Sequence, residues 1–416
     1  AARLAIAFLI VALVSALLSR APDIGLFGLY EWGTGWLFWL SCAGAFAIGA
    51  SLLRQDGEWV FYGLLGGGLL NVLVAIYQVA VHPATGMLRG YDGGSQADGL
   101  LGNPVHLEAL LVGAVALVAS RSCDSLKRWW WVLVLLGLGV ELTSERLAIP
   151  VLLVIFAAVL YRRRLKGAVF SGLVAAGYGL GYVVGGSGLG HRVASGTAET
   201  TFGLRLQLWH TALHAVALHP LIGGGPGEVL GTIAPLVGRG FARNLTGGRL
   251  FTDSHNWIVE VVVTTGLLGL ACFAAWLLLA VSRSRGPFLA FAAALLAVEL
   301  VEPMNIGVTP LAFLAIGAAA AGLGRPARLA TSVLPEHAGA SSDRRSGGAA
   351  AGLRSRRAPA AVTALAVVAA LFVGVTMIAG DYFYTQAKTS TFNESNPTRA
   401  NTLWPYWPES AIEVAF

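Results

Sequence analysis

The chain has 416 residues, of which 56% are hydrophobic and 12% charged, and its formal net charge is +6. Soluble proteins carry about 25% charged residues, so this composition predicts an integral membrane protein and excludes an ordinary soluble domain. Basic residues on cytoplasmic loops are expected of any membrane protein, so the positive charge does not indicate nucleic-acid binding. The three cysteines, Cys42, Cys123 and Cys272, are too few and too scattered to predict a disulfide framework or a cysteine metal site.

Apolar segments recur along the chain. A spanning helix needs about 20 apolar residues, or about 17 where flanking side chains reach the interface. About eleven candidates, several of them short, predict an all-α, polytopic integral membrane helical bundle of about 11 to 12 helices. The candidates lie at approximately 2–19, 34–54, 58–81, 104–120, 129–143, 147–161, 167–186, 257–281, 287–302, 308–324 and 359–380.

Arginine and lysine are concentrated in alternate loops. Short basic loops mark the cytoplasmic side of a membrane protein, and the segments 121–128, 162–166, 283–285 and 325–357 would share that side. The N-terminus is then cytoplasmic and the C-terminal end lies outside. The loops expected to face outward are 20–33, 82–103, 143–146, 187–256 and 303–307.

These spans and loops divide the chain into six regions. The last region, the tail at 381–416, resembles the start of a tetratricopeptide-like helical repeat. One such unit cannot bury its own apolar face. The regions are an N-terminal bundle at 1–186, a large outward loop with amphipathic helices at 187–256, further spans at 257–324, a basic disordered cytoplasmic linker at 325–358, the last span at 359–380 and the tail at 381–416.

The longest interval between apolar spans, residues 200–256, is polar and holds most of the candidate chemistry. Such a concentration of basic side chains predicts a cationic pocket at a membrane surface. Five of the eight histidines and five arginines lie in this interval or just before it: His191, His210, His214, His219, His255, Arg192, Arg205, Arg239, Arg243 and Arg249.

The same interval predicts two helices with a glycine-rich loop between them. Apolar spacing predicts an amphipathic helix over 203–219, lying across the mouth of the bundle and ended by Pro220. A second, short helix is expected over 228–237. The apolar face of the first helix is expected to include Leu204, Leu208, Leu213 and Val216, and the glycines at 223, 224, 225 and 227 predict a loop that a ligand backbone can approach closely.

His255 precedes the span that begins at Trp257. A histidine at the water-facing end of a rigid helix is well placed to act as a general base near neutral pH. The alternative is a structural histidine that caps or anchors the helix at the headgroup level.

Two arginines are candidates for binding phosphate. Arg205 lies on the polar side of the expected amphipathic helix, and arginine matches phosphate oxygens bidentately while remaining charged. Arg146 lies between two closely spaced spans at the outer rim. The alternatives are a solvated surface position for Arg205, and for Arg146 a rim anchor that Glu145 neutralises.

Asn103 and Glu302 complete the polar set. Asn103 precedes a span, where an asparagine serves as N-cap. Glu302 follows another span, where its carboxylate is expected to orient the histidine or to balance the arginines. The outward loops contain no HExxH motif, no P-loop and no G-x-S-x-G motif, so no metal ligand set or serine nucleophile is predicted.

Several segments together resemble a known family. The motif R-x-x-x-W at 205–209, HPLIGGGPGE at 219–228 and SHNWIVEVVVTTGLLGL at 254–270 resemble the signature region of the O-antigen ligase superfamily. The likeness extends to GLLGNPVHLEALL at 99–111 and TSERLAIPVLL at 143–153. That superfamily contains lipopolysaccharide O-antigen ligases, bacterial protein O-oligosaccharyltransferases and some polysaccharide polymerases.

The resemblance implies a GT-C-like membrane glycosyltransferase of the bacterial inner membrane with its site facing the periplasm. Such enzymes move a glycan from undecaprenyl diphosphate to an acceptor hydroxyl, with inversion and without a metal or other cofactor. His255 would then be the general base, while Arg205 and Arg146 would hold the diphosphate. We assign substrate contacts to Arg192, Arg243, Arg249, Asn256, Asn103 and Glu302.

The identity of the acceptor stays open at this point. The lipid A-core oligosaccharide is the favoured acceptor. A pilin-type protein and a growing polysaccharide are kept as alternatives, because the expected outward tail is more typical of protein oligosaccharyltransferases and polymerases. A lipid-linked glycan transporter is a second class of function, but it predicts charged residues at mid-bilayer depth, and here they lie at the rim. A scaffolding subunit that docks through its tail is a third.

Overall fold

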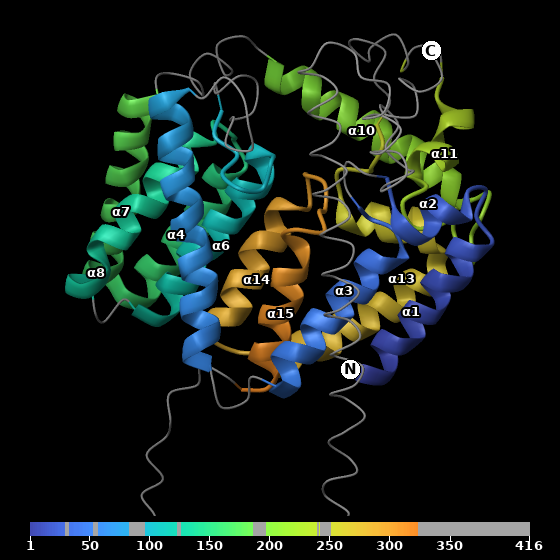
Figure 1. Cartoon of the computed structure of the whole chain (residues 1–416), viewed down its shortest axis with the longest axis horizontal. Coiled ribbons are helices and arrows are strands. Elements are labelled where there is room, and N and C mark those ends of the chain that lie inside the picture. The colour runs from blue at the N-terminus through green and yellow to red at the C-terminus, as the bar shows by residue number, and fades with distance from the viewer. Residues whose placement is uncertain are drawn as a thin grey trace, which may run out of the picture.

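The computed structural model of the chain describes residues 1–29, 33–52, 57–82, 96–122, 126–185, 197–238, 241 and 251–322. Within these ranges the regular elements are helices and no strand occurs (Figure 1). The expected linker, last span and tail lie outside the described residues, and so do Arg192, Arg243 and Arg249.

Every candidate span between residues 1 and 324 falls on a helix, which confirms the predicted all-α fold. The second candidate corresponds to α3 and the π-helical turn η1 that continues it. The elements in chain order are α1 (Ala2–Leu17), α2 (Pro22–Phe27), α3 (Trp36–Ala47), η1 (Ile48–Leu52), α4 (Gly57–Val81), α6 (Pro104–Ser122), α7 (Leu126–Leu142), α8 (Ala148–Gly185), α10 (Thr197–Val216), α11 (Val229–Ile233), the 3-10 turn η3 (Ala234–Leu236), α13 (Trp257–Arg283), α14 (Pro287–Val298) and α15 (Thr309–Ala320).

The helices differ in whether they are long enough to cross a bilayer. Among the described residues, α4, α6 and α13 are long and apolar enough to span a membrane, and four other apolar helices are shorter. The expected span 287–302 ends as a helix at Val298, because the chain turns there, and Glu302 is buried beyond that turn. The structure is thus a multi-pass membrane bundle whose helices are partly shorter than the sequence predicts.

Helix α8 accounts for two predicted spans at once. It continues through the expected loop at 162–166, but the backbone bends sharply at Arg164, which has φ 42° and ψ −111°. Beyond the bend the chain packs back on itself, since a Cβ at Gly167 would lie 2.6 Å from the Val159 carbonyl oxygen. The two predicted spans are therefore two helices joined by a tight reversal.

Glycines bring α7 and the second part of α8 into close contact. A Cβ at Gly137 would lie 2.1 Å from the Val174 carbonyl oxygen, and one at Gly177 would lie 2.0 Å from that of Val134. Small residues allow helix backbones to approach closely in membranes, where packing rather than the hydrophobic effect holds helices together. This pair consequently depends on glycine at both positions.

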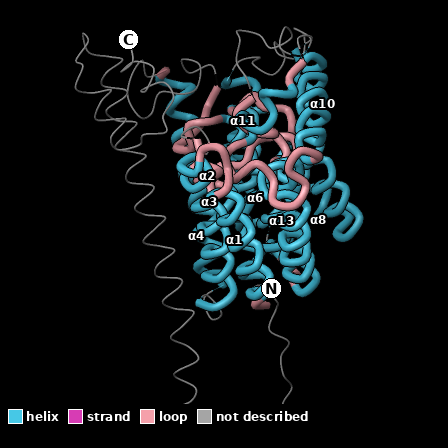
Figure 2. The backbone as a smooth tube through the Cα atoms, turned by 90° about the vertical axis from the view of Figure 1, so that its right-hand side faces the viewer, coloured by secondary structure: helices cyan, strands magenta, loops and turns pink. Residues whose placement is uncertain are grey.

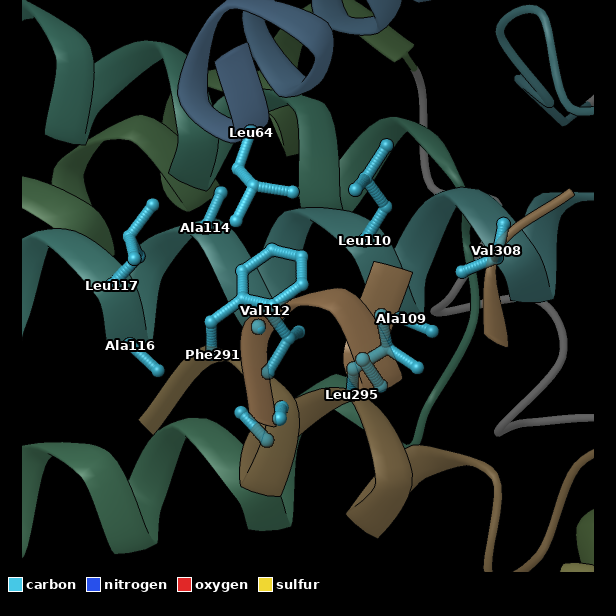
Figure 3. Close-up of a cluster of buried hydrophobic side chains, with 14 of the residues drawn as sticks. Leu64, Ala109, Leu110, Val112, Ala114, Ala116, Leu117, Phe291, Leu295 and Val308 are labelled. Atoms are coloured by element: carbon cyan, nitrogen blue, oxygen red, sulfur yellow. The ribbon is translucent and has the colours of Figure 1, made fainter. Parts of the chain in front are cut away.

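The core is centred on α6, whose apolar residues contact α4 and α14. Figure 3 shows Phe291 of α14 placed against α6, with Leu64 of α4 on the other side. The Phe291 ring lies against Gly113, where a Cβ would meet it at 3.1 Å. A second, aromatic part of the core joins α1, α3, α13 and α15 through Phe8, Trp39, Phe273, Trp276 and Phe313.

Helix α13 is interrupted at Gly266, which has φ 69° and ψ −174°. The interruption leaves the carbonyl groups of Val263 and Thr264 to accept hydrogen bonds from the N–H groups of Gly224 and Gly225, both at 2.9 Å. Beyond it, the N–H groups of Leu267 and Leu268 donate to the carbonyls of Pro220 and Leu221 at 2.9 and 3.2 Å. Irregular backbone inside a membrane protein must be satisfied by other protein groups, and the glycine-rich loop does this for α13.

The glycine-rich loop itself packs against the protein. A Cβ at Gly223 would lie 2.4 Å from the backbone of Thr264, and one at Gly225 would lie 2.5 Å from the Ser19 side chain. A Cβ at Gly227 would lie 3.0 Å from Gly28. The interpretation that these glycines admit a ligand backbone was therefore wrong, because the chain's own helices fill the space.

Helix α10 lies across one end of the bundle, the end away from the N-terminus (Figures 1 and 2). It begins at Thr197, before the predicted position, and ends at Val216, three residues before the predicted end. Its buried face is made of Leu208, Ala212 and Ala215, which pack against α11 and α13. Leu213 is exposed, contrary to the predicted apolar face, because the buried positions follow the spacing 208, 212 and 215.

Candidate active site

The loops predicted to face outward meet at the α10 end of the bundle. The Gln96 side-chain amide donates to the Thr143 carbonyl at 3.2 Å and to the Glu145 carboxylate at 3.2 Å. At the neighbouring loops, the Trp257 N–H donates to the Glu299 carbonyl at 3.3 Å. Segments far apart in sequence are therefore joined by hydrogen bonds at this end of the bundle.

His255 is held by the aspartate two residues before it. Oδ1 of Asp253 accepts the backbone N–H of His255 at 2.6 Å and lies 2.6 Å from Nδ1 of its ring. His255 has φ 49°, a left-handed conformation that is uncommon outside glycine, asparagine and aspartate. The aspartate thus fixes both the backbone and the ring, leaving Nε2 as the ring nitrogen on the opposite side.

The residues around His255 anchor this loop to α10 and α13. Ser254 donates from its N–H and its hydroxyl to Glu260 Oε2, at 2.9 and 2.7 Å. Trp209 of α10 donates from Nε1 to the Ser254 carbonyl at 2.8 Å. Asn256 caps α13, because its Oδ1 accepts the N–H groups of residues 258 and 259. The catalytic candidate is therefore mounted on a rigid support.

The His255 ring is mostly buried, with 18% of its side chain exposed, and it meets Phe251 edge to face at 5.2 Å. Burial by itself lowers the pKa of a histidine. The carboxylates of Asp253 and Glu302 act in the opposite direction and outweigh burial and the Arg205 charge, so that the pKa of His255 is raised above its ordinary value of 6.5.

Arg205 and Glu302 form an ion pair next to His255. Nη2 of Arg205 donates to Oε1 of Glu302 at 2.7 Å, and the two side chains are 14% and 7% exposed. Both charges act on His255, so the structure brings these three predicted residues into one site. Arg205 Nε is buried and has no hydrogen-bond partner among the described residues, so the guanidinium retains donor capacity.

Arg146 lies in the short connection between α7 and α8, at the same end of the bundle. The preceding residue, Glu145, acts electrostatically on Glu302, which places this connection beside the ion pair. The backbone carbonyl of Arg146 accepts the Ile149 N–H at 3.2 Å. Its predicted contact with phosphate stays a prediction.

Asn103 and Asn256 both cap helices. Oδ1 of Asn103 accepts the Val105 N–H at 3.0 Å and so caps α6, as the sequence suggested. A capping oxygen leaves the side-chain NH₂ group available to a ligand. The predicted substrate contacts of these two residues are compatible with that geometry and remain predictions.

Three residues of the site had no assigned role in the sequence analysis. Asp253 holds the histidine, and the buried His106 of α6 interacts electrostatically with Asp253 and His255. Oε1 of Glu108 accepts the Ala148 N–H at 2.5 Å and so ties α6 to the start of α8. An aspartate two residues before a histidine was the one available signal, since that spacing allows the side chain to bind the later backbone N–H.

Other histidines lie away from this cluster. His210 and His214 are exposed on α10 with ring centroids 4.4 Å apart, and His219 is exposed in the turn after α10. Across the described ranges, no three side chains of His, Cys, Asp or Glu are arranged to hold a metal ion. The described residues of the site thus bring together the His255 imidazole, the Arg205 guanidinium and their carboxylate partners, with the His106 ring buried nearby.

Comparison with known proteins finds one family model that resembles part of the chain. The family model described as O-antigen ligase matches residues 131–274, a range that includes Arg146, Arg205 and His255. No curated protein matches the chain. The matched range and the multi-pass helical fold agree with the resemblance seen in the sequence, so this part of the chain is similar to the O-antigen ligase family.

Proposed function

We propose that the protein transfers a glycan en bloc from undecaprenyl diphosphate to an acceptor hydroxyl, with the lipid A-core oligosaccharide as the favoured acceptor. One observation supports this proposal most strongly. The His255–Asp253 pair and the Arg205–Glu302 ion pair lie next to each other at one end of a membrane bundle. The reaction would take place at the periplasmic face of the inner membrane, and the donor lipid would lie between helices.

The chemistry follows from the two pairs. His255 would take the proton from the acceptor hydroxyl as its oxygen attacks the anomeric carbon, and the bond from that carbon to the diphosphate would break with inversion. Asp253 would stabilise the imidazolium that forms. Arg205 and Arg146 would stabilise the charge on the departing diphosphate, since a guanidinium binds phosphate oxygens bidentately.

The direct test uses the purified full chain in proteoliposomes with an undecaprenyl-diphosphate-linked glycan. Three acceptors are offered separately: lipid A-core, a pilin-type protein and a free polysaccharide end. We expect mass spectrometry to detect a new glycosidic bond on lipid A-core. Transfer only to the protein or the polysaccharide would keep the chemistry but change the acceptor, and translocation without any new bond would contradict the proposal.

The rate of transfer is expected to depend on the protonation of His255. A general base must be neutral, and the pKa of His255 is raised by its carboxylate neighbours despite burial. The initial rate should therefore fall as the pH decreases through a value above the ordinary 6.5 of histidine. In Asp253→Asn the raising charge is absent, so the midpoint of the rate profile should move to lower pH. An unchanged midpoint in that variant would contradict this account.

A further inference from the structure

A groove unrelated to the candidate active site lies on the outer surface between α4 and α7. Its volume is about 350 Å³, and Tyr62, Gly66 and Leu69 of α4 line it together with Arg128, Trp129 and Trp131 of α7. Figure 1 shows both helices at the outer edge of the bundle. The lining residues belong to the first parts of α4 and α7, whereas the candidate site adjoins the other end of α7.

On α4 the groove is open at Gly66, which lines it without a side chain between Tyr62 and Leu69. Nothing lies within 4 Å of a Cβ built at Gly63, Gly66 or Gly67. The strip from Tyr62 to Leu69 covers about 10 Å of helix. Its walls are aromatic, with the Tyr62 and Trp129 rings stacked at 6.3 Å. An apolar groove with aromatic walls fits a hydrocarbon chain.

The Arg128 side chain places a positive charge at the groove. Arg121 at the end of α6 is already paired with Glu58 and stacked on Phe61. Arg128, by contrast, has no carboxylate partner among the described residues, and its guanidinium lies 5.7 Å from the Trp129 ring centroid. The exposed Trp59 and Trp130 lie near the starts of the same two helices, and tryptophan is enriched at the level of lipid headgroups. The free cation is therefore placed where a headgroup phosphate would lie.

We propose that this groove binds one anionic glycerophospholipid, with an acyl chain over Gly66 between Tyr62 and Leu69 of α4 and the headgroup phosphate on Arg128. A second copy of the chain fits less well, because a two-fold contact here would bring Arg128 of one copy towards Arg128 of the other. Basic pockets between membrane helices bind anionic headgroups. The site is independent of the proposed transferase reaction.

The test is native mass spectrometry of the purified full chain, released from nanodiscs that contain equal amounts of phosphatidylglycerol and phosphatidylethanolamine with identical acyl chains. We expect one retained phosphatidylglycerol. Arg128→Gln should reduce its retention about fivefold relative to phosphatidylethanolamine. Gly66→Leu, which fills the groove, should reduce retention of both lipids. Arg162→Gln removes an exposed arginine elsewhere and is the matched control, expected to behave as the parent chain.

All three substitutions are at exposed positions, and gel filtration checks that each variant elutes as the parent chain does. Equal retention of the two lipids by the parent chain would overturn the proposal, as would undiminished phosphatidylglycerol in Arg128→Gln and Gly66→Leu. A lipid-free dimer that cross-links through Gly66→Cys would also overturn it, since the groove would then belong to a second copy.

Discussion

His255→Ala is expected to lower the rate of glycan transfer by about 10²- to 10⁴-fold, while the protein remains folded and inserted in the membrane. The expectation rests on position: the ring is held by Asp253 at 2.6 Å and lies beside the Arg205–Glu302 pair. Loss of the imidazole removes the group that takes the acceptor proton but leaves the cap of α13, which Asn256 provides. The measurement is the initial rate in proteoliposomes with saturating substrates.

Two variants distinguish a chemical role from a structural one. His214→Ala removes an exposed histidine of α10 and should retain the parent rate. Asp253→Asn keeps the size of the side chain that accepts the His255 N–H, so it should fold normally while transferring more slowly. If His255→Ala retained the full rate, the proposed mechanism would have to be abandoned, although the similarity of residues 131–274 to the O-antigen ligase family would stand.

Gly266→Ala is expected to destabilise the protein by at least about 3 kcal/mol. Gly266 has φ 69° and ψ −174°, a region essentially restricted to glycine, and a Cβ there would lie 2.3 Å from the Leu221 carbonyl oxygen. To relieve that contact, α13 would have to move away from the glycine-rich loop. The hydrogen bonds between this loop and the backbone on either side of Gly266 would then be lost. A large decrease in the thermal unfolding midpoint in detergent is the expected result.

Gly63→Ala is the matched control. This glycine lies within the helical span of α4, and nothing lies within 4 Å of an added Cβ. Alanine is favoured over glycine inside a helix by about 0.5 to 1 kcal/mol, so this variant should equal or exceed the parent in stability. Similar losses in both variants would show that glycine content, rather than the interruption of α13, governs stability.

Much of the fold was predictable because apolar segments in a membrane protein carry a strong signal. The positions of α4, α6 and α13 followed from runs of apolar residues, and the N-cap role of Asn103 followed from its place before Pro104. The reversal at Arg164 was predicted only as a loop, because a single residue with positive φ leaves no pattern in the sequence.

The residues that meet in the candidate site could be picked out from the sequence, and their roles stay predictions, but their pairings could not be predicted. His255, Arg205 and Glu302 were all identified, yet Glu302 was open to either of two roles, and the structure places it on Arg205 at 2.7 Å. That contact joins residues 97 positions apart, which spacing alone does not reveal. The glycines at 223 to 227 were misinterpreted for a similar reason, since their partner is an interruption in a helix some forty residues later.

The pairing of Arg205 with Glu302 bears on turnover in the proposed reaction. Because the guanidinium is already compensated before any donor arrives, a diphosphate gains only part of the attraction that an uncompensated cation would offer. In the proposed reaction, Glu302 would pair with Arg205 again once the glycan has left, and this would help to displace the spent carrier lipid. The expected result is weaker binding of the donor together with faster release of the carrier diphosphate.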